Sequence, residues 1–89
     1  MGWQGRGGMA FRVEIMIEAL DRHHLLEDLA RTLADSGVHI IGGSMQTLAD
    51  GVVRDRFVVE VGDVRQLDNI LANIRSIDTV YDAYRVVGG

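Results

Sequence analysis

The strongest constraint on the fold is a change in hydrophobic periodicity that occurs twice along the chain. From Phe11 to Leu20 apolar and polar side chains alternate, as expected for a strand with one buried face. The apolar side chains then adopt helical spacing, at Leu26, Leu29, Ala30 and Leu33. The second half repeats the change, because residues 52–61 alternate and helical spacing follows at Leu67, Ile70, Leu71 and Ile74. Two strand–helix units therefore organise the chain.

Capping and turn residues mark the boundaries of these units. The Asp21 carboxylate is expected to cap the first helix, and Gly37 suits the left-handed residue that often follows a helix. Asp50-Gly51 is a strong signal for a two-residue hairpin turn. We therefore predict strands at residues 10–20, 38–48, 52–61 and 79–87, and helices at residues 24–36 and 64–76.

The resulting order, β-α-β-β-α-β, predicts an α+β fold of the ferredoxin-like βαββαβ type. In this plait a four-stranded antiparallel sheet carries both helices on one face, and the second and fourth strands form its edges. Residues 1–9 are rich in glycine and lack periodicity, so we expect a flexible leader there. Residues 10–87 are expected to form a single domain.

The predicted hairpin turn also sets the pairing of the two strands that it joins. If Ala49 pairs with Val52, strand residues of one parity face the helices and the others face away. This register places Ile40, Gly42 and Ser44 on the helix-covered side, and Ile41, Gly43 and Met45 on the open side. Adjacent glycines inside a strand further predict a bulge, or the close approach of another backbone or a ligand.

Composition excludes several classes of function. The 89 residues include no cysteine, which removes thiol catalysis, disulfides and thiolate metal sites. The net charge is −4 without a basic stripe, so we expect no direct binding of nucleic acid by this chain. No apolar run is long enough for a membrane span, and no signal-peptide core is present. A cytoplasmic location, no cofactor and no membrane association are therefore the expectations.

The histidines and carboxylates of the first turn do not form a catalytic or metal-binding pattern. Asp21, His23 and His24 are adjacent, but neighbouring residues at a helix start point in different directions. No nucleophile in a strained turn accompanies the Asp21 and His24 pair. We therefore expect no catalytic residues and no metal ligands in this chain.

The uncovered face of the sheet predicts self-association. It is expected to carry more apolar surface than a solvated face needs, at Met16, Ile41, Met45 and Val58. The second strand is also long and apolar for an exposed edge, and such edges are normally covered or paired. A homodimer is therefore expected, through either these four side chains or the edge of the second strand.

Asp21-Arg22 followed by Leu25-Leu26 resembles the first turn of an ACT domain, a small ligand-binding module of amino-acid metabolism. The resemblance covers residues 11–87 and includes residues 18–21, residues 27–29, residues 38–40 after a glycine, residues 57–63 and residues 80–86. These stretches are similar to the C-terminal ACT domain of RelA/SpoT-type bifunctional (p)ppGpp synthetase/hydrolases, also called GTP pyrophosphokinases. The actinobacterial members are especially similar, through the histidine after Asp-Arg and the tyrosines of the last strand.

The resemblance implies regulation by a small effector, commonly an amino acid, with valine and isoleucine as candidates. It implies that ACT domains pair and hold the effector between the first turn of one chain and the second strand of its neighbour. In this sequence those positions are Asp21, Arg22, His23, His24, Leu25, Ile40, Ile41, Gly42 and Gly43. The implied partners are a second copy, the catalytic domains of a parent enzyme and, through that parent, the ribosome and tRNA.

The sequence departs from the family at His24, where ACT turns usually carry a glycine before the paired leucines. A side chain there reduces the room for an effector. A regulatory sensor of a (p)ppGpp enzyme therefore stands beside two alternatives: a ligand-free module for dimerisation or ribosome docking, and a free-standing ACT regulator of amino-acid metabolism.

Overall fold

The computed structural model describes residues 11–87, and the leader expected at residues 1–9 lies outside this range. The elements are β1 (Phe11–Leu20), α1 (Leu25–Asp35), β2 (His39–Thr47), β3 (Val52–Val61), α2 (Gln66–Arg75) and β4 (Val80–Val86). Every boundary in the described range lies within two residues of its prediction. The predicted α+β order is confirmed.

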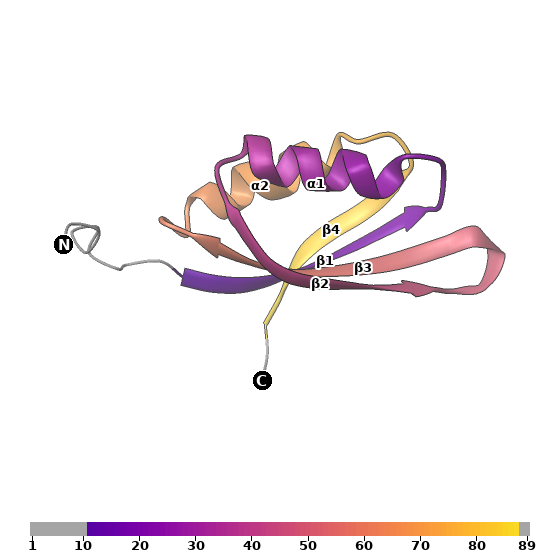
Figure 1. Cartoon of the computed structure of the whole chain (residues 1–89), viewed down its shortest axis with the longest axis horizontal. Coiled ribbons are helices and arrows are strands. Elements are labelled where there is room, and N and C mark those ends of the chain that lie inside the picture. The colour runs from indigo at the N-terminus through magenta and orange to yellow at the C-terminus, as the bar shows by residue number, and fades with distance from the viewer. Residues whose placement is uncertain (1–10, 88–89) are drawn as a thin grey trace.

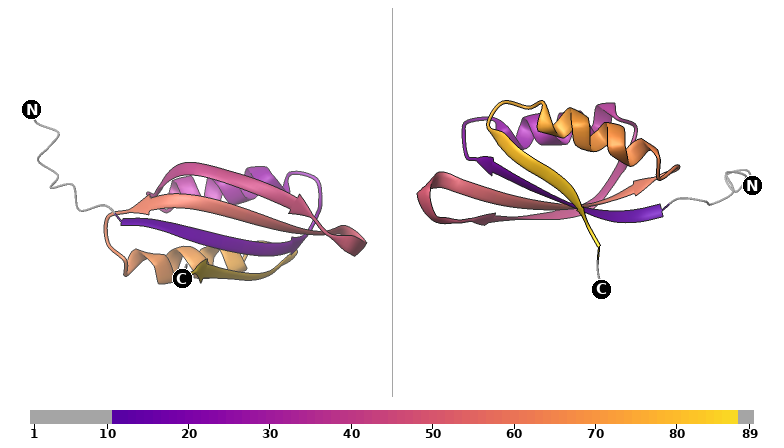
Figure 2. Two further views of the ribbon diagram at one scale, coloured as in Figure 1. Left: turned by 90° about the horizontal axis from the view of Figure 1, so that it is seen from below. Right: turned by 180° about the vertical axis from the view of Figure 1, so that it is seen from behind.

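The four strands form one antiparallel sheet in the order β2-β3-β1-β4. Both helices lie above the same face of this sheet (Figure 1). The view from below shows the uncovered face, with β2 and β4 at its two edges (Figure 2). This arrangement is the predicted ferredoxin-like plait, with the predicted edge strands.

The core lies between the sheet and the two helices. Odd-numbered residues of β1 and β3 face the helices, and α2 contributes the four predicted apolar residues, all of them buried. In α1 the buried side chains are Leu25, Leu29 and Leu33. Leu26, predicted as part of the buried stripe, is 49% exposed. The helix is therefore rotated relative to the prediction, and Leu26 is free to line a surface site.

The predicted register of β2 against β3 is wrong throughout the hairpin. The connection is longer than two residues, because Ala49–Gly51 form a short 3-10 turn and the Leu48 N–H donates to the Val52 carbonyl at 2.7 Å. Thr47 therefore pairs with Val53, and Gly43 pairs with Phe57. A shift of one residue exchanges the two faces of a strand. Gly43 and Met45 therefore face the helix side, whereas Gly42 and Ser44 face the open side.

The predicted bulge is present in β2, and it restores the original parity. Pairing shifts between Ile40 and Gly42, so Ile41 is the extra residue. Ile40 consequently pairs with Val59 rather than with Val61, the partner in the predicted register, but it packs against the core, as predicted. The bulge leaves Ile41 on the open side, where it lies close to Gly42 and Val58.

The open face is largely charged rather than apolar. Arg56 and Arg54 of β3 lie 2.8 and 3.4 Å from Glu14 and Glu18 of β1, respectively. Met16, predicted as an interface residue, is only 8% exposed within a single chain. Met45 lies on the other side of the sheet, so the four predicted interface side chains do not share one face. Of that set, Ile41 and Val58 remain together on the open side.

Candidate functional site

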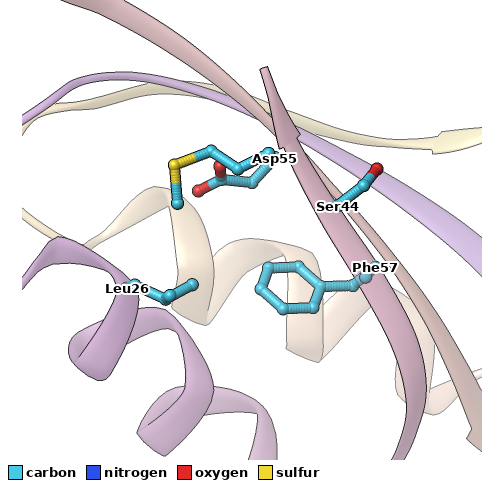
Figure 3. Close-up of a pocket in the computed structure, with 6 residues that line it drawn as sticks. Leu26, Ser44, Asp55 and Phe57 are labelled. Atoms are coloured by element: carbon cyan, nitrogen blue, oxygen red, sulfur yellow. The ribbon is translucent and has the colours of Figure 1, made fainter. Parts of the chain in front are cut away.

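A cavity of about 290 Å³ opens between the first turn of α1 and the hairpin of β2 and β3. Its walls are mostly apolar, and it is lined by Leu26, Gly43, Ser44, Met45, Asp55 and Phe57. The side chains of Leu26 and Phe57 point toward each other across it, whereas Ser44 points away from it (Figure 3). Leu26 and Met45 are about half exposed, so the cavity is accessible from solvent.

Asp55 is the charged residue of this cavity. It takes an inward position on β3 between Val53 and Phe57, and it is 1% exposed. Neither of its carboxylate oxygens has a hydrogen-bond partner among residues 11–87. Burial, and second the negative charge of Asp21, raise the pKa of the Asp55 carboxyl. A buried carboxylate without a hydrogen-bond partner among residues 11–87 therefore lines an apolar cavity.

The turn between β1 and α1 precedes Leu26 of the cavity wall and is held by Arg22. The Arg22 guanidinium donates to Asp28 Oδ2 at 2.7 Å, to the His23 carbonyl at 3.0 Å and to the Asp78 carbonyl at 3.4 Å. The hydrogen bond from Arg22 lowers the pKa of the Asp28 carboxyl. One side chain thereby ties the turn to α1 and to the connection before β4.

His24 occupies a left-handed backbone conformation, with φ at +67°. Glycine adopts this conformation without steric cost, which explains why a glycine suits this position. The His24 imidazole contacts the Glu27 carboxylate and packs edge-on against His23, with ring centroids 4.2 Å apart. It is exposed and does not line the cavity. In a single chain, the His24 side chain therefore does not reduce the volume of the cavity.

The predicted helix cap at Asp21 is wrong. The capping position belongs to His24, which makes no side-chain cap bond. The Asp21 backbone N–H instead donates to the Gly51 carbonyl at 2.8 Å, joining the first turn to the hairpin turn. This bond brings the Asp21 charge close to Asp55, because the hairpin turn directly precedes β3.

The other predicted site residues are divided among the core, the first turn and two surface hollows. Leu25 is buried in the core and Ile40 packs against it. Ile41 and Gly42 line a second hollow, on the open face, together with Arg12 and Arg56. Gly43 lines both hollows and is the one predicted effector contact in the apolar cavity. Arg22 and His23 lie in the adjoining turn.

Sequence reasoning missed Leu26, Met45, Asp55 and Phe57 as site residues. The signal for Asp55 was present, because it is the only polar residue among the inward positions of β3. Met45 was assigned to the open side by the incorrect register. Among residues 11–87 no group of three histidine, aspartate or glutamate side chains is arranged to hold a metal ion. None of the described helices is long and apolar enough to cross a lipid bilayer.

The fold places this chain among the small α+β plait domains. Residues 7–85 match the family described as the ACT domain, and the chain belongs to that family. The chain is 44% identical over 94% of its length to the bifunctional (p)ppGpp synthase/hydrolase RelA of Mycobacterium tuberculosis. It is 41% identical over 98% of its length to the GTP pyrophosphokinase of Streptomyces antibioticus. The predicted resemblance to this group of enzymes is confirmed.

The chain spans about a tenth of the length of these curated relatives, 11% and 10% respectively. Among solved structures, it is similar to the ACT domain from the GTP pyrophosphokinase of Chlorobium tepidum, with a TM-score of 0.76. That alignment covers 86% of this chain and 99% of the other at 16% identity, so it supports the fold alone.

Proposed function

We propose that this chain is an effector-binding regulatory domain of a (p)ppGpp synthetase/hydrolase and that the effector is a small amino acid. The ACT domain is a regulatory module, and the relatives in Mycobacterium and Streptomyces are named as enzymes of this nucleotide. The cavity beside the first turn is the proposed effector site.

The observation that carries this proposal is the open apolar cavity between α1 and β2. Pockets that hold drug-sized ligands begin at roughly 300 Å³. The volume of this cavity lies at that lower limit, so it suits a smaller ligand. Leu26, Met45 and Phe57 offer an aliphatic or aromatic side chain an apolar surface. The cavity also adjoins the turn of Asp21, Arg22, His23 and His24, the turn at which the resemblance places the effector.

Regulation requires that the effector bind one state of the parent enzyme more tightly than another. The cavity offers a means for this, because its walls come from the start of α1 and from the hairpin of β2 and β3, and β2 is an edge strand that a partner can reach. An effector held between them favours the state in which they lie together.

Calorimetric titration of the 89-residue chain with each standard L-amino acid tests the binding step. We expect saturable binding of one amino acid at about one per chain. Leu26→Ala should weaken this binding because it removes an apolar wall. Val64→Ala is a matched control, because Val64 is similarly exposed, at 44%, and does not line the cavity. Absence of binding by every amino acid would contradict the sensor role.

The regulatory step needs the parent's catalytic domains. Replacing the matching region of the Mycobacterium tuberculosis RelA relative with this chain provides them, since the two are 44% identical. The amino acid found by titration should then change the ratio of synthesis to hydrolysis in the chimera, and the Leu26→Ala chimera should need more of it. A ratio that does not respond to a bound effector would leave a binding domain without a regulatory role.

A ligand-free dimerisation or docking module is the second candidate, and the exposed edge of β2 favours it. β2 has one neighbour, β3, so its outer backbone groups are unpaired among the described strands. Ile41 and Met45, at 41% and 48% exposure, add apolar surface to this edge. Under this role a dimer forms without any effector, and Ile41→Lys should dissociate it in sedimentation measurements. If the unsubstituted 89-residue chain remains monomeric at high concentration, that result would count against this role.

A further inference from the structure

The Asp55 carboxylate is the most unusual polar group in the described part of the chain. It is 1% exposed, and both of its oxygens lack hydrogen-bond partners among residues 11–87. Buried carboxylates in proteins are normally paired or hydrogen-bonded, because the loss of hydration is otherwise uncompensated. Because Asp55 lines the apolar cavity, a ligand bound in that cavity can supply the missing hydrogen-bond donor.

No described side chain supplies that donor. The charged group that acts on Asp55 is Asp21, which has the same sign and raises the pKa of Asp55 further. Arg54 and Arg56, its neighbours on β3, face the open side of the sheet, where they pair with glutamates of β1. Residues 11–87 therefore contain no positive partner for Asp55.

The walls of the cavity define the rest of the ligand. Leu26, Met45 and Phe57 give apolar walls to the cavity that Asp55 also lines. A hard metal ion requires about six or more oxygen ligands, which one carboxylate among apolar walls does not provide. A single water molecule needs two to four polar partners, roughly, to be held in such a place. A compact cation attached to an aliphatic body fits both the acceptor and the walls.

We propose that Asp55 binds the primary ammonium group of a small aliphatic amine, whose apolar part lies against Leu26, Met45 and Phe57. This rests on the proposed function where the amine is an α-amino acid effector, and it names the group by which that effector is recognised. An ammonium carries three donors, so it can satisfy both carboxylate oxygens of Asp55 at once.

A second copy of the chain does not supply this ammonium from a side chain. All nine cationic residues of the sequence are arginines, and lysine is absent. An arginine from a partner would bring a planar guanidinium with five donors, for which the apolar walls offer no further acceptors. A free amine is therefore the ligand that the site fits.

Three matched ligands test the ammonium requirement on the intact 89-residue chain. L-Valine carries both charged groups, isobutylamine lacks the carboxylate, and isovalerate lacks the ammonium. We expect calorimetric binding of valine and isobutylamine, and none of isovalerate at the same concentrations. Asp55→Asn should weaken the two amines by roughly tenfold or more, the value of a charge-assisted hydrogen bond. Asp35→Asn is the control, because Asp35 is exposed at the other end of α1.

The outcomes separate this inference from the proposed function. If an amino acid binds but isovalerate competes with it and Asp55→Asn has no effect, the effector site stands and the role of Asp55 is overturned. If isobutylamine binds through Asp55 but no amino acid does, the ammonium site stands and the amino-acid sensor is overturned. If no amine binds, both are overturned. The comparison of isobutylamine with isovalerate decides the point on the unmodified chain even if a variant fails to fold.

Discussion

Gly43 on β2 lies directly opposite Phe57 on β3, and the phenyl ring occupies the space where a side chain at Gly43 would stand. A Cβ at Gly43 would lie 3.1 Å from Phe57 Cδ1 and 3.1 Å from the Arg56 carbonyl oxygen. Gly42, one residue earlier, has no atom within 4 Å of the same position. A side chain at Gly42 therefore has room, whereas a side chain at Gly43 forces neighbouring atoms of the cavity wall to shift.

Gly43→Ala should destabilise the chain by about 1–3 kcal/mol, the usual cost of overpacking. The added Cβ meets both the Arg56 carbonyl, which belongs to the sheet, and the Phe57 ring, so both have to shift, and the methyl group itself takes up space at a residue that lines the cavity. Urea unfolding measures the loss, and valine titration measures the reduced room for a ligand. Gly42→Ala is the matched control and should be neutral or slightly stabilising, because glycine weakens a strand. Equal unfolding midpoints for the two variants would contradict this assignment.

His24→Gly should stabilise the chain by roughly 1 kcal/mol, because a left-handed conformation costs about this much for residues other than glycine. The contact of His24 with Glu27 is solvent-exposed, so its loss offsets little of this gain. Thermal unfolding provides the measurement. His23→Gly is the control: His23 is exposed but does not have a positive φ, so the added chain entropy should lower stability. A stabilising effect at both positions would point to a cause other than backbone strain.

The fold was predictable because its signals are redundant. Alternation marks β1 and β3, helical spacing marks α2, and a glycine marks the end of α1. These signals are independent of one another, so an error in one element does not change the prediction of the others. Gly37 shows this agreement, since its φ is +81°, as expected after a helix. The order of elements then restricts the sheet to very few topologies.

The register of β2 was not predictable in the same way, because it depends on single residues. Asp50-Gly51 indicated a two-residue turn, and both residues do take a positive φ, but Ala49 joins them in a longer turn. The extra residue exchanged the faces of Gly42 to Met45, and the bulge at Ile41 restored the predicted face for the residues before it. Ile40 was therefore assigned to the correct face, although its partner in the sheet was not the predicted one.

The candidate site depended on that register and on one unrecognised signal. Met45 reaches the cavity side because of the longer turn. Asp55 interrupts a row of valines and a phenylalanine at inward positions, and a polar residue in such a row indicates a buried group with a special role. The absence of its partner is visible only once the packing around it is known.

Arg22→Gln should lower stability at neutral pH, because Arg22 joins the first turn to Asp28 and to the connection before β4. The pKa of Asp28 is lowered mainly by its hydrogen bond from Arg22, so this stabilisation is fully present above the unfolded value of 3.8. It is lost as pH falls through the lower pKa of the folded state. Chemical unfolding at several pH values should therefore show the two proteins converging under acidic conditions.

Arg31→Gln is the control for Arg22. Arg31 approaches the other oxygen of Asp28 at 3.4 Å, but its side chain is 66% exposed, and it makes no hydrogen bond or ion pair to another element among residues 11–87. We expect a smaller effect at every pH. An effect as large as that of Arg22→Gln would mean that the charge near Asp28 matters and the link across elements does not.

Asp55→Asn should stabilise the ligand-free chain at neutral pH, by on the order of 1 kcal/mol, because a buried charge without a partner costs more than a neutral amide in the same place. Burial and Asp21 raise the pKa of Asp55, so the folded state binds a proton more tightly than the unfolded state does. The favourable contribution of the protonated carboxyl is complete below 3.8 and is lost as pH rises through the raised pKa of the folded state. The advantage of the variant should therefore be small in acid and grow to a plateau towards neutral pH.

Urea unfolding across this pH range, with Asp35→Asn as an exposed control, measures that profile. At neutral pH, saturating isobutylamine should make the unsubstituted chain more stable than Asp55→Asn. The amine stabilises the unsubstituted chain by mass action and leaves the variant nearly unchanged. A destabilised variant in the absence of ligand would mean that Asp55 has a partner within the chain. If the variant is more stable and no longer binds the amine, the chain retains an unfavourable buried charge because binding requires it.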